Sequence, residues 1–383
     1  MKKKGILGWL GAVDPVLFFA MAFLSLLSIL IIFGSVENFG RSKLVMQCAM
    51  TAAGAVVLFL IANVDYRFFV DRFWLILLVA SSLLLAVTLI FGNSGQGIET
   101  ANKSWLRLPV VGISIQPSEF VKIAFLCTFS KHIDLVRDQI NKPLPLLGLL
   151  LHAGLVVGLI LLSGDLGVAL VYIGIILVML YCSGLSMWYF LVAAIVVAVS
   201  FPVLWDFLKL YQQERILYGF RPELDPDNVG RQALLSRETI AAGGFFGIGL
   251  LEGGFYESLP ASHTDFIFAT VCEKLGVVGG LSVVAALSVI AVRLLILGFR
   301  CRDSVGRLIC SGIAAVIIIQ SVENLWMCLG LVPVVGITLP FMSAGGSSVL
   351  ALYALMGLAH SVAAKEKKMH FRSRPKRKSS TAV

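Results

Sequence analysis

Long apolar stretches, separated by short polar segments, follow one another from residue 15 to residue 364. A helix needs roughly 20 apolar residues to cross about 30 Å of hydrocarbon. Measured against that length, the pattern predicts about ten membrane-spanning helices. The predicted spans are 15–34, 44–63, 73–92, 118–136, 145–163, 166–183, 187–207, 265–295, 308–333 and 347–364. The stretch 118–136 is the weakest, because Glu119, Lys122 and Lys131 interrupt it.

The composition of the chain agrees with this pattern. Of its 383 residues, 58% are hydrophobic and 14% are charged, whereas about a quarter of a soluble globular chain is charged. This composition excludes a soluble enzyme, a disordered chain and a disulfide-stapled secreted module. We therefore predict an all-α polytopic membrane protein, with a single ten-helix transmembrane domain over residues 1–364.

The net charge of +9 becomes informative once the basic residues are placed. Lys and Arg are enriched in cytoplasmic segments of membrane proteins. With the N-terminus inside, most of them fall in the cytoplasm, including eight in the tail 365–383. Both termini are therefore predicted to be cytoplasmic, with a disordered tail that can rest on anionic lipid. The basic surplus reflects topology and does not indicate a nucleic-acid partner.

The predicted external segment 93–117 carries the first group of unusual polar residues. It holds Trp105 and Arg107 and leads directly into Glu119 and Lys122. The last two are three residues apart, so they share one helix face and can form an ion pair. Such a pair either serves a site or only fixes helix packing. Trp105 is either a site residue or a member of the aromatic belt at the membrane surface.

A long external segment, residues 208–264, joins the seventh and eighth predicted spans. It carries Arg215, Arg231 and several glycines. Loops of this length in compact folds are usually functional or disordered, and aromatic residues alternating with glycines argue against disorder. A glycine-rich stretch can offer backbone N–H groups to an anion, although glycine is also common in re-entrant turns.

His263 and Asp265 stand directly before the eighth predicted span. One interpretation is a helix cap, with Asp265 in the first turn, where a carboxylate favours the helix dipole. The other is a functional site. Glu273 lies deeper, where an ionisable residue is costly and usually faces a polar cavity. Further residues assigned to this cavity are Asp165, Glu323 and Asn324.

The ionisable residues within the spans lie almost entirely in the outer halves of those spans. A proton or ion pathway would distribute such residues through the whole bilayer. A cavity that opens outward and to lipid fits the pattern better. Its predicted ligands are amphiphiles whose polar heads lie at the outer face.

These residues resemble the SEDS family, the RodA/FtsW/SpoVE proteins of bacterial elongation, division and sporulation. The strongest segment runs from Leu259 to Phe268 and is similar to the family signature Leu-Pro-x-x-His-Thr-Asp-Phe-Ile-Phe. The similarity covers nearly the whole chain. Further matching segments are the Trp105 loop, Gln116 to Lys122, Asp165 to Gly167, and Leu339 to Ser348. The resemblance of the last segment assigns Ser343, Gly345 and Gly346 to the cavity as well.

The resemblance implies a peptidoglycan glycosyltransferase in the bacterial cytoplasmic membrane. Such enzymes polymerise lipid II, a disaccharide-peptide carried on undecaprenyl diphosphate, and work with a class B penicillin-binding protein. The family's essential carboxylate corresponds to Asp265, its tryptophan loop to Trp105, and its Pro-Ser-Glu-x-x-Lys lysine to Lys122. A divalent cation, Mg or Mn, is also implied by analogy, although the sequence shows no dedicated set of ligands.

The chemistry of the reaction suggests roles for these residues. A carboxylate can take the proton from the attacking 4-hydroxyl of the acceptor, and we hypothesise that Asp265 does so. Cations must offset the charge that develops on the leaving diphosphate. Lys122 has motif support for this role. Other substrate-binding candidates are Arg107, Arg215, Arg231, His263 and Glu119.

Two other functions stay open at this point. A lipid II flippase would need a polar path to the inner leaflet, whereas the inner halves of the spans are almost uncharged. A non-catalytic scaffold for the transpeptidase would tolerate Asp265→Asn. Departures from the family pattern leave the elongation, division or sporulation role undecided. These departures are Ser163-Gly164 for Gln-Pro before Asp165, Lys274 for a second glutamate after Glu273, and Arg231 and Ala344 for tyrosines.

Overall fold

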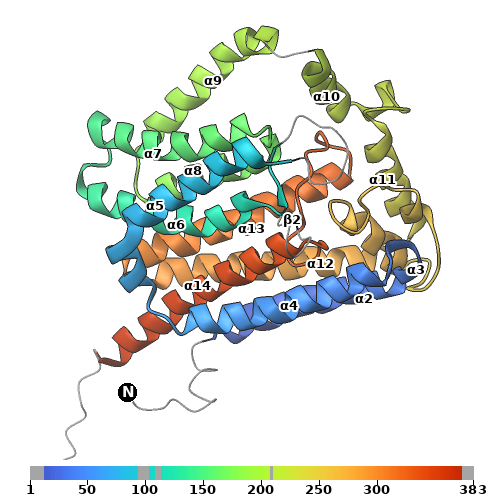
Figure 1. Cartoon of the computed structure of the whole chain (residues 1–383), viewed down its shortest axis with the longest axis horizontal. Helices are drawn as coiled ribbons and strands as arrows, with labels where there is room; N and C mark the ends of the chain where they lie inside the picture. The colour runs from blue at the N-terminus through green and yellow to red at the C-terminus, as the bar shows by residue number, and fades with distance from the viewer. Residues whose placement is uncertain (1–12, 94–102, 108–113, 208–209, 373–383) are drawn as a thin grey trace, which may run out of the picture.

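The computed structural model describes residues 13–93, 103–107, 114–207 and 210–372. Within them, ten helices of at least 17 residues coincide one by one with the ten predicted spans. They are α2 (Pro15–Gly34), α4 (Arg41–Ala62), α5 (Tyr66–Phe91), α6 (Pro117–Val136), α7 (Pro143–Leu162), α8 (Leu166–Cys182), α9 (Met187–Phe207), α12 (Ile267–Arg300), α13 (Ser304–Cys328) and α14 (Gly346–Arg372). Figure 1 shows them as a bundle whose long helices run roughly side by side.

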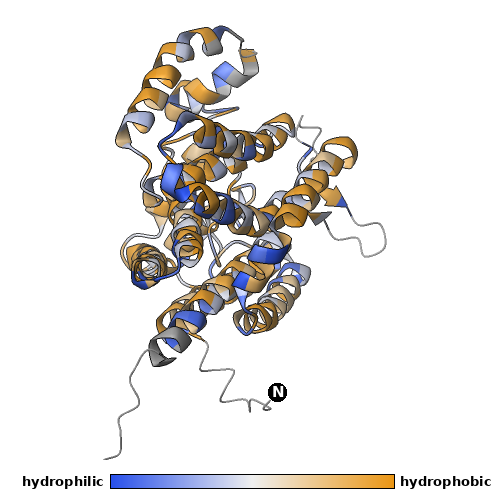
Figure 2. Cartoon of the chain, turned by 90° about the vertical axis from the view of Figure 1, so that its left-hand side faces the viewer, coloured by the Kyte–Doolittle hydropathy of each residue, from blue (hydrophilic) through white to orange (hydrophobic). Residues whose placement is uncertain are grey.

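The membrane character of these helices follows from their length and surface. Among the described residues, seven helices are long and apolar enough to cross a membrane, and Leu166–Cys182 and Met187–Val203 are shorter apolar helices. Figure 2 shows hydrophobic residues dominating the helices, with hydrophilic ones mostly scattered between them. The all-α polytopic membrane fold predicted from the sequence is confirmed.

The least apolar of the predicted spans, α6, lies inside the bundle. It packs against α5, α7, α8, α13 and α14, and twelve of its twenty residues are buried. Its polar side chains therefore face protein and not lipid, which removes the cost of exposing them to hydrocarbon. This position explains why hydropathy alone marks α6 so weakly.

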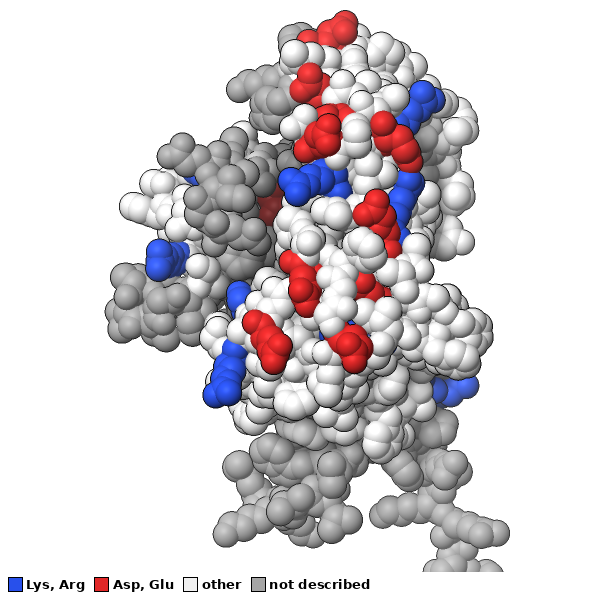
Figure 3. All heavy atoms as spheres, turned by 90° about the vertical axis from the view of Figure 1, so that its right-hand side faces the viewer, with Lys and Arg blue, Asp and Glu red and all other residues white. Residues whose placement is uncertain are grey.

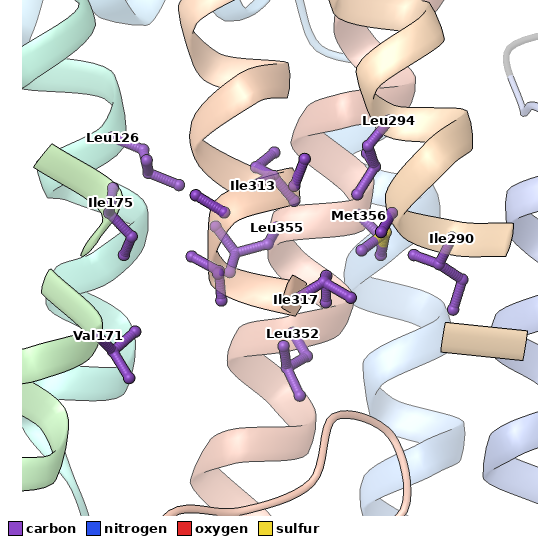
Figure 4. Close-up of a cluster of buried hydrophobic side chains, with 14 of the residues drawn as sticks. Leu126, Val171, Ile175, Ile290, Leu294, Ile313, Ile317, Leu352, Leu355 and Met356 are labelled. Atoms are coloured by element: carbon purple, nitrogen blue, oxygen red, sulfur yellow. The ribbon is translucent and has the colours of Figure 1, made fainter. Parts of the chain in front are cut away.

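The core is a contiguous apolar cluster that is densest where five of the helices meet and extends to α2, α4, α5 and α7. Figure 4 shows side chains from α6, α8, α12, α13 and α14 meeting there, among them Leu126, Ile313 and Leu355. In lipid, close packing and interhelical hydrogen bonds hold helices together, since the surroundings are equally apolar. Two such bonds join α2 to its neighbours. The Tyr353 hydroxyl donates to Ser25 (2.8 Å), and the Gln47 amide donates to Ser28 (3.0 Å).

The first and last helices meet at one end of the bundle, at the left of Figure 1. The backbone N–H of Asp14, which caps α2, donates to Nδ1 of His360 on α14 (3.0 Å). The start of α2 and the end of α14 therefore lie on the same side, as the predicted topology requires. The final helix continues to Arg372, past the predicted boundary at 364, and Lys365 pairs with Asp65 (2.8 Å). The remaining tail, 373–383, lies outside the described residues.

The connecting segments at the other end are folded against the bundle. The strands β1 (Leu106–Arg107) and β2 (Ser114–Ile115) pair antiparallel and lead into α6. The long segment 208–264 is not an open loop, because most of it is helical or packed on α12. The short helices within the described residues are α3 (Val36–Phe39), η1 (Arg137–Gln139), α10 (Leu210–Phe220), η2 (Pro222–Leu224), α11 (Arg231–Ala242) and η3 (Phe255–Glu257). Figure 3 looks onto this end, where acidic side chains run down the middle of the face.

Candidate active site

Asp265 lies in a tight turn, two residues before α12 begins at Ile267. The capping interpretation, which puts Asp265 in the first helical turn, is therefore wrong. The turn closes because the N–H groups of Thr264 and Phe266 both donate to the carbonyl of Ala261 (3.0 and 3.2 Å). Ala261 has φ 56°, a left-handed conformation that an alanine rarely adopts. The chain reaches helical geometry only after this turn.

A second loop, residues 330–345, locks the turn in place. The Ser343 hydroxyl donates to the carbonyl of Thr264 (2.7 Å), and the N–H of Ala344 donates to the carbonyl of His263 (2.9 Å). This loop also contains a left-handed residue, Phe341, with φ 63°. Such conformations cost roughly 1–3 kcal/mol each, persist only where the surroundings enforce them, and cluster at functional sites.

The backbone of Asp265 is held in place, whereas its side chain is not paired with any described residue. The Asn324 amide donates to the carbonyl oxygens of Asp265 (2.6 Å) and Ile337 (2.7 Å). Within the described residues, the Asp265 carboxylate forms no hydrogen bond or ion pair. Burial and the neighbouring Asp165 carboxylate raise the pKa of Asp265 to about 6. A carboxylate of this kind is available as a proton acceptor near neutral pH.

His263, two residues before Asp265, packs against Phe39 at the end of α3. Its ring is 5.2 Å from the Phe39 ring, centroid to centroid. Burial, together with the Lys43 ammonium, lowers the pKa of His263 to about 4. The ring is therefore neutral at physiological pH and offers one hydrogen-bond donor and one acceptor.

Asp165 anchors the outer ends of three helices. Its Oδ1 accepts the N–H of Val168 (3.2 Å) as the cap of α8, and its Oδ2 accepts the side-chain amide of Gln116 (3.0 Å). The N–H of Gln116 in turn donates to the Ser347 hydroxyl of α14 (3.2 Å). Burial raises the pKa of Asp165 against the opposing effect of these hydrogen bonds. In the sequence, Gln116 stands out only as part of a motif, and nothing there indicates its link to three helices.

Glu119 and Lys122 form the ion pair that their spacing predicted. The Lys122 ammonium lies 2.8 Å from Glu119 Oε1, and the two side chains are 1% and 4% exposed. The second oxygen of Glu119, Oε2, has no partner within the described part of the chain. The charge of Lys122 also acts on Asp165 and Glu323. Lys122 is thus a buried cation set among several carboxylates.

The Trp105 loop contacts the site region through its backbone. Trp105 forms a β-bridge with Asn93, and the N–H of Lys103 donates to the carbonyl of Ser163 (2.8 Å). Ser163 lies in the turn that leads to Asp165. The loop is therefore attached close to the outer start of α8.

Of the three candidate arginines, two have exposed side chains in the structure. Arg107 in β1 and Arg231 at the start of α11 are exposed, and neither forms an ion pair within the described residues. The side chain of Arg215 lies outside the described part of the structure. Gly345 and Gly346 adjoin Ser343, but a Cβ there would meet only ordinary contacts at 3.5 and 3.6 Å.

Glu273 does not face an outward cavity, contrary to the prediction. Its two carboxylate oxygens accept the N–H groups of Phe255 (2.7 Å) and Tyr256 (2.9 Å). The adjacent Lys274 donates to the carbonyl of Leu250 (2.8 Å) and lies over the Tyr256 ring (4.4 Å). These charges are satisfied by a folded loop, so they stabilise its structure.

Arg237 is a further residue that the sequence analysis missed. Its guanidinium donates to the carbonyls of Leu329 (2.8 Å) and Gly330 (3.1 Å), where α13 ends and the 330–345 loop begins. The neighbouring Ser236 hydroxyl donates to Cys328 (2.7 Å). Helix α11 therefore supports the loop that holds Asp265. No motif or spacing marks this contact, because its partners lie more than 90 residues away.

The fold and this site define a multi-pass membrane protein whose buried carboxylates converge at the outer end of the bundle. The model of the FtsW/RodA/SpoVE family of cell cycle proteins matches residues 12–368. The chain belongs to this family, which confirms the resemblance seen in the sequence.

Curated relatives and a solved structure agree with this membership. A probable peptidoglycan glycosyltransferase FtsW of Trichlorobacter lovleyi is 33% identical over 86% of each chain. The peptidoglycan glycosyltransferase MrdB of Escherichia coli is 32% identical over 91% of this chain and 93% of its own. A chain solved in a peptidoglycan synthase complex aligns with TM-score 0.79 and 31% identity, covering 92% of this chain and 98% of that one.

Proposed function

We propose that this protein is a peptidoglycan glycosyltransferase that polymerises lipid II at the outer face of the bacterial cytoplasmic membrane, with Asp265 as general base. The activity class rests on the family and on relatives that carry this name. One observation supports the assignment of Asp265. Its backbone is clamped by Asn324 while its carboxylate has no hydrogen-bond partner among the described residues.

The reaction joins two lipid-linked sugars. The 4-hydroxyl of the acceptor attacks the anomeric carbon of the donor, and the α-linked diphosphate leaves, so a β-1,4 bond forms with inversion. Asp265 takes the hydroxyl proton as the new bond forms, which requires hydrogen-bond reach to that oxygen. Lys122 supplies positive charge as the diphosphate leaves, while Glu119 holds its ammonium.

A divalent cation, Mg or Mn, stays a prediction from family analogy. Among the described residues no cluster of three or more His, Cys, Asp or Glu side chains could hold a metal ion. Asp165, the carboxylate near Asp265, has both oxygens in hydrogen bonds to protein groups. This donor set does not fit a resident metal ion, and the roles given to Asp265 and Lys122 involve protein groups alone.

The partner that we propose is a class B penicillin-binding protein, the transpeptidase that crosslinks the new strand. The solved relative from a peptidoglycan synthase complex supports an assembly of this kind. The flippase alternative is not favoured, because curated relatives carry the name of a peptidoglycan glycosyltransferase. The scaffold alternative is not favoured either, because curated relatives are named as enzymes.

The test compares wild type with Asp265→Asn in the purified complex with its partner, supplied with labelled lipid II. We expect glycan polymer from wild type and none from the variant, with the complex still assembled. Asp227→Asn makes the same chemical change on the exposed outer turn and should polymerise normally. Polymer from Asp265→Asn at the wild-type rate would refute the assignment. Scrambling of lipid II by wild-type liposomes without any polymer would favour the flippase.

A further inference from the structure

An uncharged segment, residues 243–251, connects α11 to the region beside α12. It lies at the right of Figure 1, next to α3. Three of its side chains are large, apolar and exposed: Phe245 (62%), Phe246 (79%) and Leu251 (75%). Exposed apolar clusters of this kind mark surfaces that contact lipid, ligand or another protein. The segment therefore needs a partner of some kind.

The segment is bonded to a break in α12. Gly276 has φ 67° and ψ −165°, so the helix is interrupted there. Backbone groups freed by a break need partners, because lipid supplies none. The N–H of Val277 donates to the carbonyl of Gly244 (3.0 Å), and the N–H of Ile248 donates to the carbonyl of Glu273 (2.9 Å). The segment and the broken helix thus supply hydrogen-bond partners for some of each other's backbone groups, so these groups do not need water.

Two glycines make this contact close. A Cβ on Gly276 would lie 2.3 Å from the carbonyl oxygen of Phe245, and a Cβ on Gly247 would lie 2.1 Å from the carbonyl oxygen of Lys274. Both glycines also have positive φ, which other residues adopt only with strain. The backbone of the segment is therefore pressed against α12, and its large side chains are left on the outside.

The depth of the segment follows from the contacts of α2. Asp14 at the start of α2 pairs with Arg293, and Gly34 at its end accepts a hydrogen bond from Lys274 (3.2 Å). At 1.5 Å per residue, α12 covers about 28 Å between Lys274 and Arg293. This length matches the roughly 30 Å of the hydrocarbon layer. Lys274, and with it the segment, lies at the outer boundary of that layer.

We propose that residues 243–251 form an interfacial anchor, whose three exposed apolar side chains insert among outer-leaflet lipids. Continuity with the spanning surface selects lipid as the occupant, because Val277 (48% exposed) and Val278 (47%) continue the patch along α12. The nearest flanking charges, Glu238 and Glu252, are both acidic. Insertion therefore depends on apolar contact and does not require anionic lipid.

The anchor is joined directly to the support of the candidate active site. It begins where α11 ends, and α11 holds the start of the 330–345 loop through Arg237. Insertion of the anchor would set the height of α11, and so of this loop, relative to the membrane surface. The proposal concerns lipid contact alone and does not depend on the enzymatic activity.

The test measures the surroundings of a spin label at position 246. Phe246→Cys is made in the full-length chain with the exposed Cys48 replaced by serine, labelled with a nitroxide and reconstituted in phosphatidylcholine vesicles. Collisions with oxygen, which concentrates in lipid, are compared with collisions with a water-soluble nickel chelate. Phe246 is 79% exposed and its ring contacts the neighbouring Phe245 ring (4.8 Å, centroid to centroid), so the substitution leaves the backbone hydrogen bonds to α12 in place. The unsubstituted Cys48→Ser protein gives the background from the remaining cysteines.

Two control positions give the reference accessibilities for lipid and for water. Leu281→Cys on α12 (63% exposed) reports lipid, and Asp227→Cys on the outer turn reports water. We expect position 246 to favour oxygen several-fold over position 227, and the ratio to stay unchanged when phosphatidylglycerol is added. Nickel accessibility equal to that of position 227 would overturn the proposal. An immobilised label reached by neither reagent would overturn it too, because a protein surface would then cover the segment. Oxygen preference only with anionic lipid would overturn the apolar mode of insertion.

Discussion

Replacing Lys122 by methionine tests how much the buried ion pair contributes to the fold and whether it also serves the site. The Lys122 ammonium is the partner of Glu119 Oε1, at 2.8 Å, and Oε2 already lacks one within the described residues. In Lys122→Met, neither oxygen of the Glu119 carboxylate would have a partner among the described residues. The carboxylate would stay buried, because both side chains are almost inaccessible to solvent.

The magnitude follows from this burial. Removing one partner from a buried ion pair costs about 3–5 kcal/mol, whereas replacing both partners by uncharged groups of similar volume is often neutral. We therefore expect Lys122→Met to lower the free energy of unfolding by about 3–5 kcal/mol, and Glu119→Gln/Lys122→Met to recover most of it. Lys365→Met is the matched control. Its ammonium is also 2.8 Å from a carboxylate, but the pair is exposed, so the expected cost is about 0–1 kcal/mol.

The assay combines unfolding with activity. Unfolding is followed in mixed detergent micelles titrated with sodium dodecyl sulfate, and the same preparations are given labelled lipid II. If Lys122 serves the reaction, the double variant should be stable but make no polymer. A stable double variant that polymerises normally would refute the role in the reaction. A single variant as stable as wild type would refute the energetic reasoning.

Three further predictions concern Asp265, the α12 break and the α2 cap. The pKa of Asp265 is raised to about 6, so its base form is lost as pH falls through that value. The polymerisation rate should then drop about tenfold for each pH unit below 6. A rate that stays constant between pH 7 and pH 5 would contradict this. Gly276→Ala would place its Cβ 2.3 Å from the Phe245 carbonyl oxygen. It would also force alanine to φ 67° and ψ −165°, a region that is essentially restricted to glycine, at about 1–3 kcal/mol for the conformation alone. Size-exclusion chromatography should therefore show loss of folded protein, whereas Gly154→Ala, with nothing within 4 Å, should elute normally. Asp14→Asn would weaken the pair with its arginine partner on α12 and should lower the free energy of unfolding by about 1.5–3 kcal/mol; an unchanged detergent-unfolding midpoint would count against it.

Features that depend on neighbouring residues were predictable from the sequence. The Glu119–Lys122 pair follows from a spacing of three residues on one helix, because that spacing alone places the two side chains on the same face. The positions of the ten long helices follow in the same way from runs of apolar residues. The identity of Asp265 as the candidate base came from the family motif around it.

Features that join distant segments were not predictable. Ser343 reaches Thr264 across 79 residues, and Asn324 reaches Asp265 across 59, so no local pattern shows that they hold the turn. Glu273 was assigned to a cavity because a buried charge usually faces one. In the fold its partners are backbone N–H groups of a loop that precedes it by 17 and 18 residues.

By itself, then, the sequence determined that the chain is a bundle of about ten apolar helices, which side its basic residues favour, and which family it resembles. These properties depend on the composition of short stretches of the chain. The bilayer requires apolar residues along each span, and basic residues are enriched on its cytoplasmic side. Only the tertiary structure decided that α6 is central, that Asp265 precedes its helix with an unpaired carboxylate among the described residues, and that Lys274 closes a loop. Each of these depends on which buried polar group finds its partner on another segment, because an unsatisfied group in a membrane is costly.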